Sequence, residues 1–223
     1  MKNPKKRNFV TCILGTTRTG KHTIAAQRVK EWKQNNKKGK VIAYDPMRRL
    51  IEQNLVDIEI KATNKNWAKV LCAKDKKGKY RYANSLLVLN TFRLLESSEM
   101  LSKHFADLLN LRTLINIDII FTVHAPYLIH TRLTYFITNY LILKTNISYG
   151  FTPRIPDFAI LKDVTKVVNK YVENRGGQDK LNYPIFPYIS YNTSTREVAY
   201  VNMTSHELIQ SLTDCYFYAG QED

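Results

Sequence analysis

Apolar residues in this chain gather in short continuous runs, and the segments between the runs have the spacing of amphipathic helices. The runs predict strands at 8–14, 40–45, 85–90, 117–124 and 140–145. Runs of this length without polar alternation are typical of strands buried on both faces. The segments between them predict helices at about 20–36, 98–115 and 129–138. This alternation indicates an α/β fold, a mostly parallel sheet with helices on both faces.

The remaining segments are more polar. Between 46 and 66 we expect a short strand near 56–60, followed by a helix near 67–72 and a charged turn at 74–79. After about residue 150 the pattern changes to a helix at 161–173, a β-hairpin formed by 188–191 and 197–202, and a last helix that a capping box of Thr204 and Glu207 begins. We therefore expect three parts: a basic tail (1–7), a core (8–150) and a C-terminal extension packed on the core (151–223).

A phosphate-binding loop, Gly15–His22, lies between the first apolar run and the first helix. In such a loop the backbone N–H groups converge on phosphates and the helix directs its positive end at them. Gly15 and Gly20 permit the tight turn, and Lys21 supplies a cation for the β- and γ-phosphates. The sequence therefore predicts ATP binding by a run of loop and helix residues: Gly15, Thr16, Thr17, Arg18, Thr19, Gly20, Lys21, His22 and Thr23. The alternative is a strand-to-helix turn that binds nothing.

The loop departs from the GxxxxGK[ST] pattern at one position. Where that pattern places a hydroxyl for Mg²⁺, this chain has His22, and the nearest hydroxyl, Thr23, comes one residue late. We take His22, Thr23 and Asn90 as the candidate magnesium ligands.

Polar residues follow three of the expected strands. In open parallel sheets the ligand lies beyond the carboxyl ends of the strands, which makes Asp45, Asn90, Thr91 and His124 candidate catalytic residues with Lys21. Asn90-Thr91 stands where an acidic pair is expected, so Asp45 is the best remaining carboxylate. His124 is a candidate sensor of the γ-phosphate.

Each of these positions has an alternative. Asp45-Pro46 is also an ordinary turn initiator, and His124 is also typical of a histidine that satisfies a backbone carbonyl. Glu96 and Glu99 are other candidate carboxylates. The candidates for an arginine that reaches a neighbouring subunit are Arg48, Arg49, Arg93 and Arg132.

The formal net charge of +15 is concentrated in two segments. Residues 1–40 hold twelve Lys or Arg against Glu31 alone, and residues 61–81 hold eight against Asp75 alone. Because lysines that contact phosphates release condensed counterions, this clustering favours a polyanionic partner, first of all DNA. A solvated lysine surface is the alternative.

The three cysteines, Cys12, Cys72 and Cys215, are widely spaced and predict neither a disulfide framework nor a zinc site. The basic N-terminus has no signal-peptide pattern, and the later apolar runs are interrupted by polar residues, so we expect no membrane span. A reducing cytoplasm fits this composition.

The order of these motifs resembles the FtsK/HerA superfamily of P-loop ATPases, in particular viral genome-packaging and Zot-like ATPases. The resemblance rests on Gly15–His22, 43–46, 86–91 and 119–126 and covers roughly residues 8–146. It implies that Asn90 and Thr91 occupy the Walker B pair and that His124 occupies the sensor position. The chain departs from the family at His22, Asn90 and Thr91, which are positions for the metal and for water activation.

Three functions remain open at this point. The first is an ATPase that forms a homo-oligomeric ring and moves DNA, with capsid or portal vertex proteins as further partners. The second is a catalytically impaired relative that acts as a structural or nucleotide-gated DNA-binding component, and the third is a small-molecule kinase.

Overall fold

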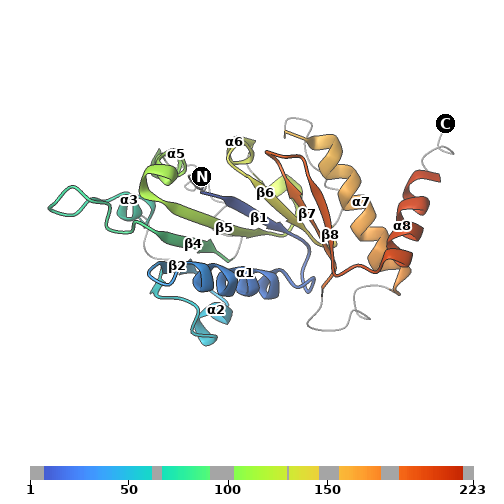
Figure 1. Cartoon of the computed structure of the whole chain (residues 1–223), viewed down its shortest axis with the longest axis horizontal. Helices are drawn as coiled ribbons and strands as arrows, with labels where there is room; N and C mark the ends of the chain where they lie inside the picture. The colour runs from blue at the N-terminus through green and yellow to red at the C-terminus, as the bar shows by residue number, and fades with distance from the viewer. Residues whose placement is uncertain are drawn as a thin grey trace, which may run out of the picture. The chain divides into compact units, whose positions relative to one another are not determined.

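The computed structural model describes residues 8–61, 67–90, 103–129, 131–145, 156–176 and 186–217, with the backbone alone at 103–105, 127, 131, 216 and 217. Its strands form an eight-stranded sheet in the order β3-β2-β4-β5-β1-β6-β7-β8 (Figure 1). The pairs β2–β3, β2–β4 and β4–β5 are parallel, whereas β6–β7 and β7–β8 are antiparallel. The predicted α/β fold with a mainly parallel sheet and a C-terminal hairpin and helix is confirmed.

The strands lie close to the predicted runs. They are β1 (Val10–Leu14), β2 (Lys40–Tyr44), β3 (Ile58–Glu59), β4 (Ser85–Leu89), β5 (Ile117–Val123), β6 (Asn139–Ile142), β7 (Tyr188–Asn192) and β8 (Val198–Val201). Every residue of β1, β4 and β5 is buried, which is what their unbroken apolar character predicts.

The helices are α1 (Lys21–Asn35), α2 (Arg49–Glu52), α3 (Trp67–Leu71), α5 (Lys103–Ile115), α6 (Thr131–Thr134), α7 (Phe158–Asn174) and α8 (Ser205–Phe217), with a 3₁₀ turn at Pro126–Leu128. The short helix α2 is not predicted by the sequence pattern. In place of the single helix expected at 129–138, the structure has the 3₁₀ turn at Pro126–Leu128 and the short α6. Pro126 is the first residue of that turn. None of the helices in the described ranges has the length and apolar character needed to cross a membrane.

The chain divides into two compact units. Unit 1 comprises residues 1–11 and 24–122, and unit 2 comprises 12–23 and 123–223. Each unit therefore takes up segments from distant parts of the sequence.

Unit 1 is a parallel α/β layer. The chain moves from β1 outward to β2 through α1 and then returns through β4 to β5, so right-handed crossovers place α1 on the face opposite α3 and α5. A buried polar pair fastens α1 to the sheet, because Trp32 donates its indole N–H to Asp118 Oδ2 at 2.7 Å. The other oxygen of Asp118 accepts the backbone N–H of Phe9 at 3.1 Å.

Unit 2 contains the antiparallel strands and the last two long helices. The β6–β7–β8 strands pair in sequence, with Tyr140 opposite Tyr191 and Ser190 opposite Ala199. The turn between β7 and β8 is closed by Asn192, whose side-chain oxygen accepts the N–H groups of Ser194 and Thr195. This confirms the predicted hairpin.

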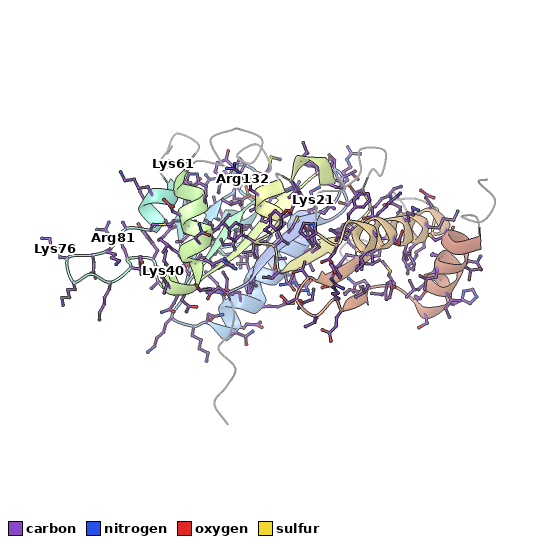
Figure 2. All side chains as sticks on the ribbon, turned by 90° about the horizontal axis from the view of Figure 1, so that it is seen from above. Lys21, Lys40, Lys61, Lys76, Arg81 and Arg132 are labelled. Atoms are coloured by element: carbon purple, nitrogen blue, oxygen red, sulfur yellow. The ribbon has the colours of Figure 1, made fainter. Side chains whose placement is uncertain are left out.

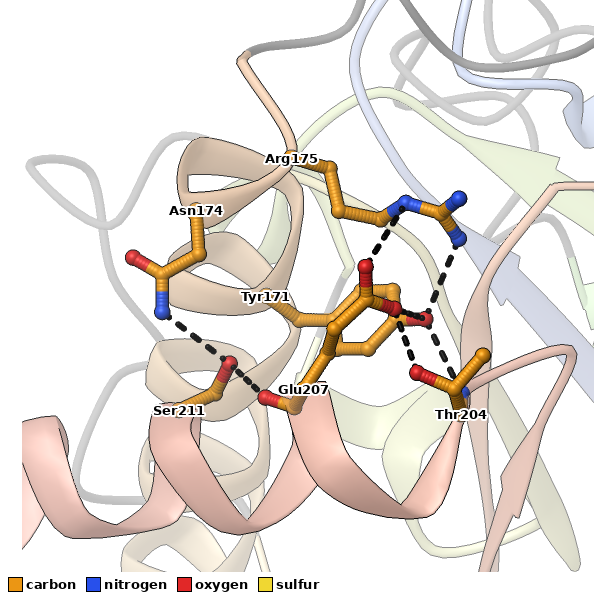
Figure 3. Close-up of polar contacts among 6 residues, drawn as sticks. All are labelled: Tyr171, Asn174, Arg175, Thr204, Glu207 and Ser211. Carbon is orange, nitrogen blue, oxygen red and sulfur yellow. Dashed lines mark hydrogen bonds and ion pairs between the residues drawn. The ribbon is translucent and has the colours of Figure 1, made fainter.

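A polar cluster joins α7 to α8 inside unit 2 (Figure 3). The buried Tyr171 donates its hydroxyl to Glu207 Oε2 at 2.9 Å and accepts the backbone N–H of Thr204 at 3.0 Å. The Thr204 hydroxyl also bonds Glu207 Oε2, at 2.5 Å, and Arg175 lies 3.5 Å from Oε1. The predicted start of the last helix is therefore confirmed, but Tyr171 rather than Glu207 takes the Thr204 N–H.

Candidate nucleotide site

The phosphate-binding loop has the predicted local structure: β1 ends at Leu14 and α1 begins at Lys21. Gly20 has a φ of 91° and Arg18 a φ of 64°, so the chain turns through left-handed conformations just before the helix. The Thr19 hydroxyl closes the turn by donating to Thr16 O at 2.8 Å. No hydrogen bond within the described ranges uses the N–H groups of Arg18, Thr19 or Gly20, which leaves these donors for an anion.

Lys21 is buried inside this loop. Its side chain is 4% exposed, and its Nζ donates to the backbone oxygens of Gly15 and Thr16, each at 2.5 Å. Burial lowers the pKa of Lys21 from its usual 10.5 to about 8. Two carbonyl oxygens therefore hold the ammonium group against the loop, and a nearby anion would stabilise its charge.

His124 lies beside the lysine, directly after β5. Its Nδ1 is 3.3 Å from Lys21 Nζ. Partial burial lowers the pKa of His124, and the charges of Lys21 and His22 lower it further. The imidazole is consequently neutral at pH 7, with Nδ1 as the acceptor for the lysine N–H. The structure thus brings together two of the predicted catalytic residues.

Segments far along the chain support the loop from within unit 2. The N–H of Thr16 donates to Lys144 O at 2.9 Å, and Gly15 N–H donates to Val123 O at 3.1 Å. Thr145, the residue after Lys144, exchanges two hydrogen bonds with the Asn169 amide of α7, at 2.9 and 2.6 Å. The loop is therefore fixed by the last residue of β5, by the segment that follows β6 and, through Thr145, by α7. The contacts of Gly15 and Thr16 join residues more than a hundred positions apart, and no local sequence pattern marks them.

Phe186 packs directly on the loop. A Cβ atom added to Gly20 would lie 2.2 Å from the Phe186 ring, and one added to Gly15 would lie 2.6 Å from the Thr19 hydroxyl. Phe186 is 7% exposed, and its carbonyl accepts the Asn202 side chain at 2.9 Å. A larger residue at position 15 or 20 would therefore collide with these neighbouring side chains. At position 20 the positive φ also favours glycine.

Asp45 and Asn90 form a second cluster, in unit 1. They directly follow the neighbouring strands β2 and β4 and are 2% and 0% exposed. Asn90 Nδ2 donates to Asp45 Oδ1 at 2.9 Å, and Leu50 N–H donates to Asp45 Oδ2 at 2.6 Å. Asp45 O also accepts the N–H of Arg48, so Asp45 begins the turn into α2 as the alternative interpretation predicted. The residue that the resemblance assigns to the Walker B position is thus a buried neutral amide that adjoins a carboxylate from the next strand.

The other candidates have less defined surroundings. His22 and Thr23 lie in the first turn of α1, both half-buried. Thr91, Arg93, Glu96 and Glu99 lie outside the described residues. Arg48 is 3.7 Å from Glu59, and Arg49 and Arg132 are exposed. No group of three or more His, Cys, Asp or Glu side chains gathers in the described part of the chain.

The strand, glycine loop, buried lysine and helix within a mainly parallel sheet define the fold of a P-loop NTPase. No protein-family model and no curated protein matches the chain.

Solved structures do match. The genome packaging NTPase B204 from Sulfolobus turreted icosahedral virus 2, in complex with ATP-gammaS, has a TM-score of 0.58 and 10% identity over 88% of this chain and 97% of that chain. The DNA-packaging ATPase B204 from Sulfolobus turreted icosahedral virus has a TM-score of 0.58 and 12% identity over 86% of this chain and 96% of that one. EccC from Thermomonospora curvata (ATPases 2 and 3), in complex with a signal sequence peptide, has a TM-score of 0.57 and 11% identity over 88% of this chain but 37% of that one.

At these identities the likeness concerns the fold. The resemblance to viral packaging ATPases and to FtsK-type ATPase domains, which the order of the motifs indicated, is confirmed at that level.

Proposed function

We propose that this chain is an ATP-binding subunit of a ring-shaped motor that moves DNA, acting in the packaging of a viral genome or the transfer of a mobile element. The observation that carries the proposal is the buried Lys21 at the start of α1, which is bonded to two loop carbonyls and to His124 Nδ1. A cation confined in this way is complementary to a phosphate chain. The shared fold of the packaging NTPases gives this loop its context.

In this proposal the N–H groups of Arg18, Thr19 and Gly20 and the Lys21 ammonium hold the phosphates of ATP. His124, neutral and next to Lys21, senses the γ-phosphate by donating its Nε2–H to a phosphate oxygen while Nδ1 accepts the lysine N–H. Thr23 and His22 lie on the turn of α1 where a magnesium ligand is needed. The partner proteins would be other copies of the chain and capsid or portal vertex proteins, in the host cytoplasm or on the particle. We also propose that the chain is organised as a basic tail (1–7), an ATPase core (8–150) and a C-terminal extension (151–223).

The buried pair of Asp45 and Asn90 favours the second candidate, a catalytically impaired component of such a machine. A P-loop NTPase needs a carboxylate at the Walker B position for the metal shell or the attacking water. Here the amide of Asn90 occupies that position and donates to Asp45. Asp45 remains our candidate for the substitute carboxylate.

ATP binding and hydrolysis, measured with and without duplex DNA, test the proposal. Lys21→Ala should weaken ATP binding tenfold or more, since loss of a hydrogen bond to a charged group costs about 1.5–3 kcal/mol. Lys144→Ala is the matched control because it removes the same charge next to the loop but keeps the backbone carbonyl that binds Thr16. Equal ATP affinities for Lys21→Ala and the wild type would contradict the nucleotide site. DNA-stimulated hydrolysis supports the motor, and ATP binding without turnover supports the impaired component.

A further inference from the structure

A lysine-rich hairpin precedes β4 in unit 1. We call residues 73–81 the lysine hairpin. Its two arms meet at the bridge between Lys74 and Tyr80, and Arg81 N–H donates to Ala73 O at 3.1 Å. Lys74, Lys76, Lys77, Lys79 and Arg81 are all exposed.

The tip of the lysine hairpin is an ordered turn. The Asp75 side-chain oxygen Oδ1 accepts the N–H groups of Lys77 and Lys79, at 2.8 and 2.9 Å. Asp75 and Lys79 also pair through their backbones at 2.7 Å, and Gly78 has a φ of 75° that the turn requires. The lysines are thus presented from a fixed backbone, and ordering it on binding costs little entropy.

A second group of cations adjoins the lysine hairpin at the N-terminal ends of the strands. Lys40, the first residue of β2, pairs in register with Ser85, the first residue of β4. A Cβ atom added to Gly39 would lie 2.9 Å from Asn84 O, so the turn that carries Lys37 and Lys38 packs against the short segment that joins the lysine hairpin to β4. Residues 34–39 and Asn84 line a shallow hollow of about 390 Å³ beside this turn. In Figure 2, Lys40, Lys76 and Arg81 lie at the same end of unit 1.

These cations have no described carboxylate as a partner. None of the ion pairs among the described residues includes Lys37, Lys38, Lys40 or a cation of the lysine hairpin. Asp75 is the acidic residue within the lysine hairpin, and its Oδ1 accepts the turn amides. Like charges gathered without counter-charges are stabilised by an external polyanion.

We propose that the lysine hairpin, together with Lys37, Lys38 and Lys40, is the surface that binds the phosphate backbone of duplex DNA. This inference rests on the proposed function for the identity of the polyanion. Within unit 1 the surface lies at the N-terminal ends of β2 and β4, whereas Asp45 and Asn90 follow their C-terminal ends. The DNA surface is therefore separate from the polar pair at the other end of these strands.

Two features favour a duplex backbone over other anionic partners. An acidic protein partner would need an apolar centre to its interface, and residues 74–79 contain no apolar side chain. Single strands are bound by exposed aromatic rings that stack on bases, whereas the Tyr80 ring is half-buried and covered by Lys74 Nζ at 5.0 Å from its centre. Lysine ammonium groups bind phosphates but lack the planar fork that forms bidentate hydrogen bonds with base edges. We therefore expect binding that does not depend on the DNA sequence.

The first test measures the salt dependence of binding to a labelled duplex by fluorescence anisotropy, between about 50 and 200 mM salt. The variant with Lys76→Gln, Lys77→Gln and Lys79→Gln should lower the slope of log affinity against log salt by up to about 2.7, which is about 0.9 for each lost contact. The matched control replaces Lys162, Lys166 and Lys170 of α7 by Gln and removes the same charge from unit 2. Its slope should stay at the wild-type value. Equal slopes for the two variants would overturn the proposal.

The second test asks whether DNA binding depends on the ordered turn of the lysine hairpin or only on its net charge. Asp75→Asn removes the negative charge but keeps an oxygen that accepts the two turn N–H groups, so it should bind the duplex more tightly than the wild type. Asp75→Ala removes the same charge and also the acceptor, so it should bind several-fold more weakly than Asp75→Asn. Equal affinity of the two Asp75 variants would overturn the role of the ordered turn.

Competition and ATP titration complete the experiment. Duplex DNA should displace the labelled duplex more effectively than single-stranded DNA or polyglutamate at equal charge, and the reverse order would overturn the choice of partner. ATP affinity should be unchanged in the lysine hairpin variants and lost in Lys21→Ala. Unchanged DNA binding in the lysine hairpin variant removes this inference alone, whereas unchanged ATP binding in Lys21→Ala removes the proposed function alone.

Discussion

Lys21 Nζ and His124 Nδ1 lie 3.3 Å apart, which couples the cation of the phosphate loop to the end of β5. The lysine also donates to Gly15 O and Thr16 O, so an approaching phosphate would compete with neutral acceptors rather than with a carboxylate. Because burial and the charges of Lys21 and His22 lower the pKa of His124, the pair holds one positive charge at pH 7. The protonation states of Lys21 and His124 therefore determine how the charge of the loop changes with pH.

We predict that the free energy of unfolding rises between pH 8 and 10.5 through Lys21. Its pKa is about 8 in the folded chain and 10.5 in the unfolded chain, so in this range the unfolded state binds more protons. The gain is about 3 kcal/mol if Lys21 alone titrates. Urea unfolding at pH values across the range measures it, and Lys21→Met should lack this component. A Lys21→Met slope equal to that of the wild type would contradict the buried, charged lysine.

The same lysine predicts proton uptake on ATP binding. Phosphate oxygens favour the ammonium form, so ATP should raise the pKa of Lys21 above its free value of about 8. ATP affinity should then fall as the pH rises above 8, and each bound ATP should take up a fraction of a proton near pH 8.5. Calorimetry in buffers of different ionisation enthalpy measures the uptake. The absence of proton uptake near pH 8.5 would contradict a lowered pKa for Lys21 in the free protein.

Gly20→Ala should destabilise the chain more than Gly78→Ala. Both glycines have positive φ, 91° and 75°, which costs an alanine about 1–2 kcal/mol. The new methyl group of Gly20→Ala also collides with the Phe186 ring, whereas nothing lies within 4 Å of the methyl group at position 78. Thermal unfolding compares the two variants. Adding Phe186→Ala to Gly20→Ala should cost less than the sum of the separate changes, and simple additivity would place the ring elsewhere.

Exchanging Asp45 and Asn90 should preserve the fold. Asn90→Asp alone puts a second carboxylate at the 2.9 Å contact, which raises one pKa and destabilises the chain at neutral pH. The double variant Asp45→Asn with Asn90→Asp keeps an oxygen for the Leu50 N–H and reverses the side-chain hydrogen bond. Urea unfolding should place the double variant nearer the wild type than Asn90→Asp.

The exchange also tests the chemistry. A carboxylate at the Walker B position should raise ATP turnover if the neutral Asn90 limits it, while Asp45→Asn alone should abolish whatever turnover Asp45 supports, typically by about 10²–10⁴-fold. Turnover that survives Asp45→Asn would contradict the assignment of Asp45 as the substitute carboxylate.

Tyr171→Phe should loosen α8 from α7. The variant keeps the ring but leaves the Thr204 N–H without its acceptor and removes a donor to Glu207, at a cost of about 1–3 kcal/mol. The bonds from Thr204 and Tyr171 lower the pKa of Glu207, and Arg175 lowers it further. That stabilisation is present above the ordinary pKa of 4.5 and is lost as the pH falls below it.

Hydrogen exchange of α8 between pH 3 and 6 measures this effect. Tyr171→Phe should show a weaker pH dependence than the wild type, and Tyr135→Phe, at a residue that is 72% exposed, serves as the control for loss of a tyrosine hydroxyl. A wild-type pH dependence in Tyr171→Phe would contradict the role of the cluster.

The sequence by itself determined the strands, the phosphate loop and the order of the polar strand ends. Unbroken apolar runs marked β1, β4 and β5 because a strand buried on both faces has no polar side to alternate with. Gly20 and Lys21 marked the loop because backbone freedom and a fixed charge are local requirements. The short helix α2 was missed because tertiary contacts, including the bond from Leu50 N–H to Asp45, define it rather than periodicity.

The tertiary structure alone decided which residues meet. Pairing of strands remote in sequence brings Lys144 and Phe186 to the loop, places Asn90 against Asp45, and sets Lys40 beside the start of β4. Local propensity carries no information on these contacts, because strand order depends on burial of the whole sheet. The sequence therefore determined which chemical groups the protein has, and the packing of the sheet determined which of them act together.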